Sequence, residues 1–196
     1  MPSTPKPPHE ALERRGRRVL LRPPARSDER AFLGAVAASA GLHKTWVQPP
    51  TSPAAFRLYV SRYATQPLRH LERARQVGFV VCERDTGVLV GVYNFSEIIR
   101  GALQSAFLGY YAFAGMNGRG LMREGLALAL DQAFRVLRLH RVEVNVQPAN
   151  ARSIALVEAA GFTREGYSHR YVKIAGRWRD HVRYAMLAED WQRRPR

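Results

Sequence analysis

The stretch FLGYYAFAGMNGRGLM, residues 107–122, decides the fold of this 196-residue chain. Its first half, through Phe113, is apolar and aromatic, which predicts a strand. Three glycines then fall within residues 115–120 and predict a turn. A helix follows at once, because apolar residues recur at helical spacing from Met122 to Leu137. This part of the chain therefore predicts a strand, a glycine turn and a helix in direct succession.

A glycine turn that enters a helix is a candidate phosphate site, because the first N–H groups of a helix are unpaired and carry partial positive charge. Glycine suits the turn because a Cβ would keep a ligand away from the backbone. The turn is not a P-loop, since Leu121 and Met122 stand where Lys and Ser or Thr are needed. It is not a dinucleotide fingerprint either, since Arg123 replaces the third glycine. Arg119 and Arg123 could reach a phosphate, but a connection without any ligand is the alternative from this turn alone.

The remaining pattern predicts a three-layer α/β (α+β) fold with a mixed, mostly antiparallel central sheet and helices on both faces. Helices are expected after the capping residues Ser27, Ser52 and Asn150, and after the glycine turn. The expected strands cover residues 19–22, 77–83, 88–95, 106–113, 141–146, a short segment from 162, 167–174 and 178–186.

The composition indicates one globular domain. Residues 1–17 are Pro-rich and then basic, so we expect a disordered arm there, a single domain over residues 18–191 and a basic tail over 192–196. The single cysteine, Cys82, excludes an internal disulfide and is expected in the core. We expect no signal peptide and no membrane span, because no apolar stretch is long enough. The single cysteine fits a reducing compartment, so we expect a cytoplasmic protein.

Five linked motifs together resemble the GNAT superfamily of acetyl-CoA-dependent N-acetyltransferases. The chain is also similar to the RimJ-type ribosomal-protein alanine N-acetyltransferases through residues 174–182, 94–96 and 100–101. The resemblance covers residues 18–191 and is weaker before Val77. The five motifs are Phe107–Tyr111, Asn117–Met122 with Glu124, Leu139–Arg141, Asn150–Ser153, and Ala160–Phe162 with Glu165 and Gly166.

This resemblance implies acetyl-CoA as cosubstrate. The strand residues Tyr111, Ala112 and Phe113 would pair with the pantetheine amides, and Asn150 and Ser153 would lie beside the pantetheine and thioester. The family turn usually opens with Gln or Arg where this chain has a glycine, which would weaken coenzyme binding without abolishing it. The residues whose backbone would wrap the CoA pyrophosphate are Gly115, Met116, Asn117, Gly118, Arg119, Gly120, Leu121 and Met122.

Acyl transfer from a thioester requires a neutral amine, a donor at the developing oxyanion and a departing thiolate. A thiol with a pKa of about 8.5 leaves readily, so no metal is needed, and the histidines show no metal-ligand spacing. Ser153 is the candidate donor to the sulfur, and Glu97 is a candidate base. The carboxylate that related enzymes carry after Gly166 is missing, since residues 171–173 read Tyr-Val-Lys. A water relay held by the backbone, Glu97 or Asp180 is an alternative, and Ser153 and Glu97 also suit purely structural roles.

The expected acceptor is the N-terminal α-amine of a protein such as a ribosomal protein. Its pKa is about 7.7–8.0 against about 10.4 for Lys, so presenting Lys as a neutral amine costs roughly 3.5 kcal/mol more. A small-molecule amine, such as an antibiotic or metabolite, and a non-catalytic acyl-CoA-binding or ribosome-associated protein are the alternatives. Trp46 is expected either to line the acceptor cleft or to fill the core, and the chain to be a monomer or homodimer.

The charge balance bears on partners. With 31 Lys and Arg against 16 Asp and Glu, the net charge is +15, which favours anionic partners. The cations that cluster late in the sequence either contact ribosomal RNA or form a solvated face. They are Arg164, Arg170, Lys173, Arg177, Arg179 and Arg183.

Overall fold

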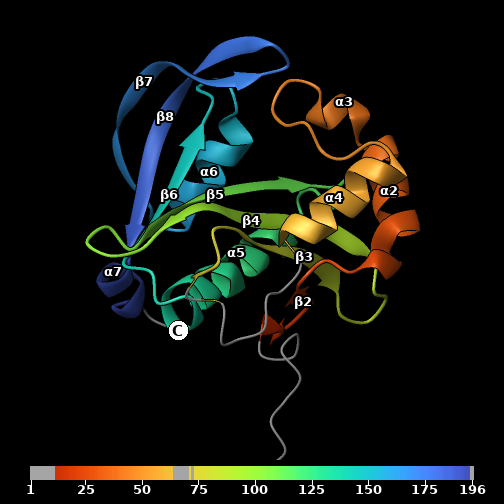
Figure 1. Cartoon of the computed structure of the whole chain (residues 1–196), viewed down its shortest axis with the longest axis horizontal. Helices are drawn as coiled ribbons and strands as arrows, with labels where there is room; N and C mark the ends of the chain where they lie inside the picture. The colour runs from red at the N-terminus through yellow and green to blue at the C-terminus, as the bar shows by residue number, and fades with distance from the viewer. Residues whose placement is uncertain (1–11, 64–70, 72, 195–196) are drawn as a thin grey trace, which may run out of the picture.

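The computed structural model describes residues 12–63, 71 and 73–194. Within them, the strands form one sheet in the order β1-β2-β3-β4-β5-β6-β8-β7 (Figure 1). All neighbouring strands are antiparallel except β5 and β6, which run parallel, so the predicted mixed and mostly antiparallel sheet is confirmed. The strands are β1 (Arg14–Arg15), β2 (Val19–Arg22), β3 (Val77–Glu83), β4 (Leu89–Ile99), β5 (Ser105–Ala112), β6 (Arg141–Val146), β7 (Thr163–Ile174) and β8 (Arg177–Leu187).

Helices cover both faces of this sheet, as predicted (Figure 1). On one face Phe32 of α2 and Phe56 of α4 pack with Val92 of β4. On the other face Leu126 of α5 and Val157 of α6 belong to the larger core cluster. The helical segments are η1 (Arg26–Asp28), α2 (Glu29–Ala38), α3 (Ala40–His43), α4 (Pro53–Tyr63), α5 (Leu121–Asp131), the π-helical η3 (Gln132–Val136), α6 (Ala151–Ala159) and α7 (Ala188–Gln192).

Two helix starts follow directly from the local sequence. Helix α4 begins at Pro53, and the hydroxyl oxygen of Ser52 accepts a hydrogen bond from the backbone N–H of Ala55 (3.2 Å). Helix α6 begins after Asn150, whose Oδ1 accepts a hydrogen bond from the backbone N–H of Ser153 (3.2 Å). Both caps satisfy N–H groups that a helix leaves unpaired, and both were predicted.

Residues 12–17 belong to the fold, which corrects the prediction of a disordered arm through residue 17. The side chain of Leu12 is 0% exposed, and its carbonyl accepts a hydrogen bond from Nε2 of Gln132 (2.5 Å). Strand β1 also pairs with Leu20 and Leu21 of β2. These are long-range contacts, so the polar local sequence did not reveal them. Residues 1–11 of the expected arm lie outside the described residues.

The C-terminal part also differs from the prediction. The two strands expected between residues 162 and 174 are one strand, β7, whose register shifts twice against β8. Helices α3 and α7 were not predicted. Gln192, placed in the expected tail, closes α7, and residues 195–196 lie outside the described part of the chain. Cys82 is buried, as predicted. Among the described helices, none has the length and apolar character needed to span a membrane.

Candidate active site

Strands β5 and β6 separate partway along β5. The parallel register joins Ser105–Phe107 to Arg141–Glu143, and no further pair follows within these two described strands. Strand β4, in contrast, stays paired with β5 as far as Ala112. The second half of β5 therefore presents an open edge, where backbone N–H and C=O groups need another partner.

The direction of the backbone groups identifies which residues face this opening. The N–H of Phe113 donates a hydrogen bond to the carbonyl of Val90 in β4 (2.8 Å). Because backbone groups alternate in direction along a strand, those of Tyr111 also face β4, whereas those of Tyr110 and Ala112 face the opening. The predicted trio is therefore corrected: Ala112 presents its backbone to the opening, and Tyr111 and Phe113 do not.

One of these edge groups already has a partner. His43, at the end of α3, is 4% exposed, and its Nε2–H donates a hydrogen bond to the carbonyl of Ala112 (2.8 Å). Its ring also lies edge-on to the ring of Tyr111, with centroids 5.0 Å apart. His43 thus covers part of the open edge on the side of α3.

The glycine turn at the end of β5 is open to a ligand. Gly115, Gly118 and Gly120 adopt φ values of 78°, 74° and 73°, a left-handed conformation that other residues rarely adopt. A Cβ at Gly115 or Gly118 would meet nothing within 4 Å. Gly120 directly precedes α5, so the first N–H groups of that helix point into the same region. The turn therefore combines open space with unpaired donors, the two features that an anion requires.

The side chains of Arg18, just before β2, and Glu83, in β3, hold this turn in place. Glu124 accepts hydrogen bonds from the backbone N–H groups of Arg18 (2.7 Å) and Val19 (3.2 Å), and its carboxylate pairs with the Arg18 guanidinium (3.0 Å). Burial opposes ionisation of Glu124, but these hydrogen bonds outweigh it and lower the pKa of its carboxyl. Arg18 also donates to the backbone carbonyl of Arg119 (2.8 Å). Arg119, predicted to reach a phosphate through its side chain, instead forms an ion pair with Glu83.

Ser153 lies on the α6 side of the opening. Its hydroxyl oxygen is 2.6 Å from the phenolic oxygen of Tyr110, which also donates to the Ser153 backbone carbonyl (3.2 Å). Burial raises the pKa of Tyr110 to about 12, so its phenol stays protonated at neutral pH. The structure therefore places Ser153, with its helix cap Asn150, beside the second half of β5.

Residues 18–163 match the family described as Acetyltransferase (GNAT) domain, which is most of the chain. The chain is a GNAT acetyltransferase. As a member of this family it is an acetyl-CoA-dependent N-acetyltransferase.

Relatives agree with this assignment. The GNAT acetyltransferase is 40% identical over 126 residues to "Probable N-acetyltransferase YjcK" of Bacillus subtilis, covering 64% of this chain and 70% of that protein. It is 39% identical over 113 residues to "[Ribosomal protein uS5]-alanine N-acetyltransferase" of Escherichia coli, and that match covers 58% of each chain, a little over half the length of the relative.

A solved structure is similar to this chain over most of its length. The structure of Mycobacterium smegmatis RimJ in complex with CoA-disulfide matches with a TM-score of 0.76 at 30% sequence identity, over 88% of this chain and 83% of that one. The GNAT-like fold that the sequence predicted is therefore confirmed.

The residues of this GNAT acetyltransferase fit acetyl-CoA. The open edge presents the N–H of Ala112 and the backbone groups of Tyr110, which are of the kind that pair with amides, and the turn from Gly115 to Met122 presents N–H donors beside open space. Acetyl-CoA supplies an activated thioester when bound. Within the described residues, no group of three or more His, Cys, Asp or Glu side chains is arranged to hold a metal ion.

On the α3 side of the opening, several polar atoms are buried without a hydrogen-bond partner. They include the phenolic oxygen of Tyr111, Nδ1 of His43 and Oδ1 of Asn145. Trp46 lies near this side, because Nε2 of Gln147, just after β6, donates to the carbonyl of Thr45 (3.1 Å). Trp46 is only half-buried and belongs to neither core cluster. Buried polar atoms without partners are costly, so this side suits a polar acceptor.

Glu97 is not joined to Ser153. It is exposed, lies where the β4–β5 register shifts between Ser96 and Ile99, and has a φ of 48°. Its charge contributes to the raised pKa of Tyr63 on α4, behind the larger effect of burial, so Glu97 lies near the α4 side of the sheet. No hydrogen bond links a carboxylate to the Tyr110–Ser153 pair within the described residues.

Asp180, the other acid considered, organises the β7–β8 hairpin. Its carboxylate accepts hydrogen bonds from the phenol of Tyr167 (2.7 Å) and the backbone N–H of Arg170 (2.7 Å). Both hydrogen bonds lower the pKa of Asp180.

Two residues at the opening were missed by sequence reasoning. Tyr110 was assigned to the apolar strand and to the motif Phe107–Tyr111 with no role of its own, although strand alternation places it opposite Tyr111, toward α6. His43 lay in a Pro-rich passage with no predicted helix, so nothing in the local pattern linked it to β5.

Proposed function

We propose that this enzyme acetylates the N-terminal α-amine of a protein in the cytoplasm, a ribosomal protein foremost. In this proposal the backbone from Gly115 to Met122 binds the pyrophosphate of acetyl-CoA, the Ala112 edge binds its pantetheine, and Asn150 and Ser153 lie beside the thioester. The observation that carries the proposal is the open edge of β5, which leads from the glycine turn to the Tyr110–Ser153 pair.

The choice of an α-amine rests on acid–base chemistry. Ser153 carries a hydroxyl proton that Tyr110 orients, so it is the proposed donor to the departing sulfur. The proposed base is Glu97, which is exposed and has no hydrogen bond or ion pair of its own within the described residues. A carboxylate is a weak base compared with an amine, and a weak base favours an acceptor amine of low pKa. An α-amine needs roughly 3.5 kcal/mol less than Lys to become neutral at pH 7.

Two relatives support a protein acceptor. The E. coli relative is named for alanine acetylation of ribosomal protein uS5, and the solved relative is RimJ of M. smegmatis. A +15 chain would repel polycationic small amines unless the cleft were locally acidic, which places small amines second.

The β7–β8 hairpin supports contact with RNA near the acceptor. Both strands expose aromatic side chains: Tyr167 is 42% exposed and Trp178 is 60% exposed. The cations of the hairpin form no ion pair within the described residues, whereas its acids, Glu165 and Asp180, do. Unpaired cations beside exposed rings suit a nucleic-acid strand, whose phosphates and bases both find partners. These cations are Arg164, Arg170, Lys173, Arg177, Arg179 and Arg183.

The acceptor can be tested by mass spectrometry. The enzyme is incubated with acetyl-CoA and either a ribosomal-protein peptide with a free N-terminal Ala and an internal Lys, the same peptide with a blocked N-terminus, or spermidine. Acetylation of the free N-terminus alone is expected. Modification of the blocked peptide at Lys, or faster modification of spermidine, would overturn the proposed acceptor.

The RNA contact needs a separate measurement. Binding of a single-stranded RNA is measured over a salt series for the wild type and for the double variant Lys173→Gln, Arg177→Gln. The variant is expected to flatten the slope of log affinity against log salt by about 0.7 per lost phosphate contact. An unchanged slope would contradict the contact.

A further inference from the structure

Lys44 follows α3 directly and lies between two hydrogen bonds that reach opposite sides of the opening between β5 and β6. On one side, His43 donates to the carbonyl of Ala112 at the open edge of β5 (2.8 Å). On the other side, the carbonyl of Thr45 accepts a hydrogen bond from Nε2 of Gln147, just after β6 (3.1 Å). The backbone of Lys44 therefore spans the opening, and Figure 1 shows the loop after α3 facing α6.

The backbone on either side of Lys44 is held in place. Its own N–H donates to the carbonyl of Ala40 in α3 (3.1 Å), which continues the helix by one residue. The N–H groups of Trp46 and Val47 both donate to the carbonyl of His43 (2.9 and 3.0 Å). The side chain of Lys44, in contrast, is exposed and forms no ion pair within the described residues. A fixed backbone with a flexible four-carbon side chain lets the ε-amine sample the space around the opening.

The thioester of the proposed coenzyme would lie close to this amine. The sulfur is proposed to lie at the Tyr110–Ser153 pair. Tyr110 is two residues from Ala112 in β5, a distance of about 7 Å at the rise of a strand. His43 contacts Ala112 directly, and Lys44 is the next residue of the chain. A lysine side chain spans a comparable distance, so the ε-amine of Lys44 can approach the acetyl group.

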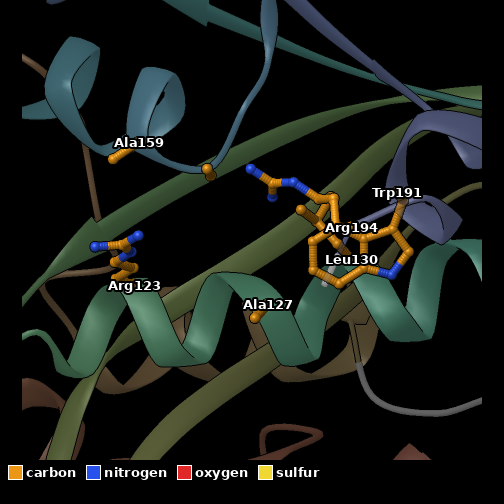
Figure 2. Close-up of a pocket in the computed structure, with 7 residues that line it drawn as sticks. Arg123, Ala127, Leu130, Ala159, Trp191 and Arg194 are labelled. Carbon is orange, nitrogen blue, oxygen red and sulfur yellow. The ribbon is translucent and has the colours of Figure 1, made fainter. Parts of the chain in front are cut away.

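The other cations of the described chain are poorer acceptors of this acetyl group. The cavity of about 310 Å³ between α5 and the end of α6 is lined by Arg123 and Arg194 and by no lysine (Figure 2). A guanidinium stays protonated and offers no lone pair. Lys173 is the other described lysine, and it pairs with Trp178 in the β7–β8 hairpin. Trp178 is four residues, or about 13 Å, beyond Val182, where the pairing of β8 with β6 ends.

We propose that Lys44 is a site of self-acetylation by acetyl-CoA bound to the same molecule. The neutral ε-amine attacks the carbonyl carbon of the thioester, a C–N bond forms, and the C–S bond breaks with its electron pair leaving on the sulfur. The proton lost by the nitrogen ends on CoA, which is released as the thiol. The modified side chain no longer carries a positive charge. This inference rests on the proposed binding of acetyl-CoA along the open edge of β5.

Tethering compensates for the poor reactivity of a lysine. The lysine of a free peptide is a weak acceptor, because its amine is mostly protonated at neutral pH. Well-oriented groups within one molecule, however, meet at effective concentrations of about 10⁵ M or more. Lys44 can therefore react under conditions in which the internal lysine of a peptide acceptor stays unmodified.

The proposal is tested by mass spectrometry of the full chain incubated with ¹³C-labelled acetyl-CoA and no acceptor. A lysine deacetylase first removes acetyl groups acquired during expression, and peptide mapping then follows the labelled fraction of each lysine. Lys44 is expected to be acetylated at least about tenfold faster than Lys173, which reports the reaction of an exposed lysine with acetyl-CoA from solution. The rate constant at Lys44 should not depend on enzyme concentration, because the reaction is within one molecule.

Three variants test the route. Ser153→Ala should slow acetylation of Lys44 by the same factor as acetylation of a peptide acceptor, since both reactions use the same thioester. Lys44→Arg keeps the positive charge and should abolish labelling of its peptide. Lys173→Arg is the matched control and should leave the rate at Lys44 unchanged. Circular dichroism of each variant shows whether it is folded.

The outcomes separate this inference from the proposed function. Acetylation of Lys44 no faster than that of Lys173, or a rate constant that rises in proportion to enzyme concentration, would overturn self-acetylation, whereas a wild type that still acetylates a peptide with a free N-terminal Ala would keep its proposed function. A wild type that neither modifies that peptide nor binds acetyl-CoA in titration calorimetry would overturn the proposed function, and the inference with it.

Discussion

The hydroxyl oxygen of Ser153 lies 2.6 Å from the phenolic oxygen of Tyr110, although the two residues are 43 positions apart in the sequence. The contact joins the first turn of α6 to the strand that carries the open edge. Because burial keeps the phenol of Tyr110 protonated, its hydroxyl can orient that of Ser153 without adding a negative charge.

This relationship predicts that the two hydroxyls act as a unit. Tyr110→Phe is expected to lower kcat about fivefold with KM for acetyl-CoA changed by less than about twofold, since a lost hydrogen bond of this kind is worth about 1 kcal/mol. Ser153→Ala should lower kcat at least as much, and the double variant should be no worse than Ser153→Ala. Steady-state kinetics with a peptide acceptor measures these changes. Tyr167→Phe removes a phenol in the hairpin and is the control, and additive losses in the double variant would argue against coupling.

The glycine turn predicts a loss of coenzyme affinity without unfolding. Among residues that have a side chain, Asn tolerates a positive φ well. Gly118→Asn should therefore fold while placing a side chain in the open space of the turn. It is expected to weaken acetyl-CoA binding at least about tenfold in titration calorimetry. Gly87→Asn is a matched control, because Gly87 has a φ of 71° and open space around it but lies in the β3–β4 turn. Equal affinities of the two variants for acetyl-CoA would contradict coenzyme binding at the glycine turn.

The proposed base predicts a change in rate with no change in coenzyme binding. Glu97→Gln is expected to lower kcat about 100-fold at neutral pH, within the range that general base catalysis contributes, and to leave the affinity for acetyl-CoA unchanged. Asp85→Asn, an acid in the turn between β3 and β4, should have no effect on either quantity. If the Glu97→Gln enzyme kept nearly full activity, solvent or another group, and not Glu97, would accept the proton from the amine.

The Glu124 carboxylate predicts a pH-dependent contribution to stability. Its pKa is lowered in the folded state, so the stabilisation is present above the unfolded pKa of about 4.3 and is lost as the pH falls through the lower folded value. Glu124→Gln is therefore expected to lower the free energy of unfolding by about 1–3 kcal/mol at pH 7, because hydrogen bonds to a charged group are lost. Denaturant unfolding at pH 7 and at pH 3 measures this. The difference between wild type and variant should shrink at pH 3, and a constant difference would show that charge is not its cause.

Much of the fold could be predicted because local sequence and tertiary structure agree. The pairing of Ser52 with Pro53 and the cap at Asn150 mark the true helix starts, and the glycine turn lies directly before α5. Strand alternation in β6 also matches, since Val142, Val144 and Val146 are buried between half-exposed neighbours. At these positions the backbone conformation depends on a few adjacent residues, which a sequence displays.

The parts that were missed depend on contacts between distant segments. Leu12 looks like part of a polar arm until Gln132, 120 positions away, binds its carbonyl. The sequence around His43 shows no helical or catalytic pattern. Its hydrogen bond to Ala112, 69 positions away, depends on the folded chain. Arg119 stands in the glycine turn, where its side chain was expected to reach a phosphate, but in the folded chain it forms an ion pair with Glu83 instead. The backbone direction of Ala112 likewise depends on which residue of β5 pairs with β4.

The short parallel contact between β5 and β6 has a mechanical consequence. Strands β1–β5 and strands β6–β8 form two panels of one sheet, and their strand pairing meets only over three residue pairs within the described chain. Because so few backbone hydrogen bonds join the two panels, we expect the angle between them to vary more readily than the angle between strands paired along their whole length. A molecule bound along the open edge of β5 would restrict this change in angle. We therefore expect the angle between the panels to vary less when the cosubstrate is bound than when it is absent.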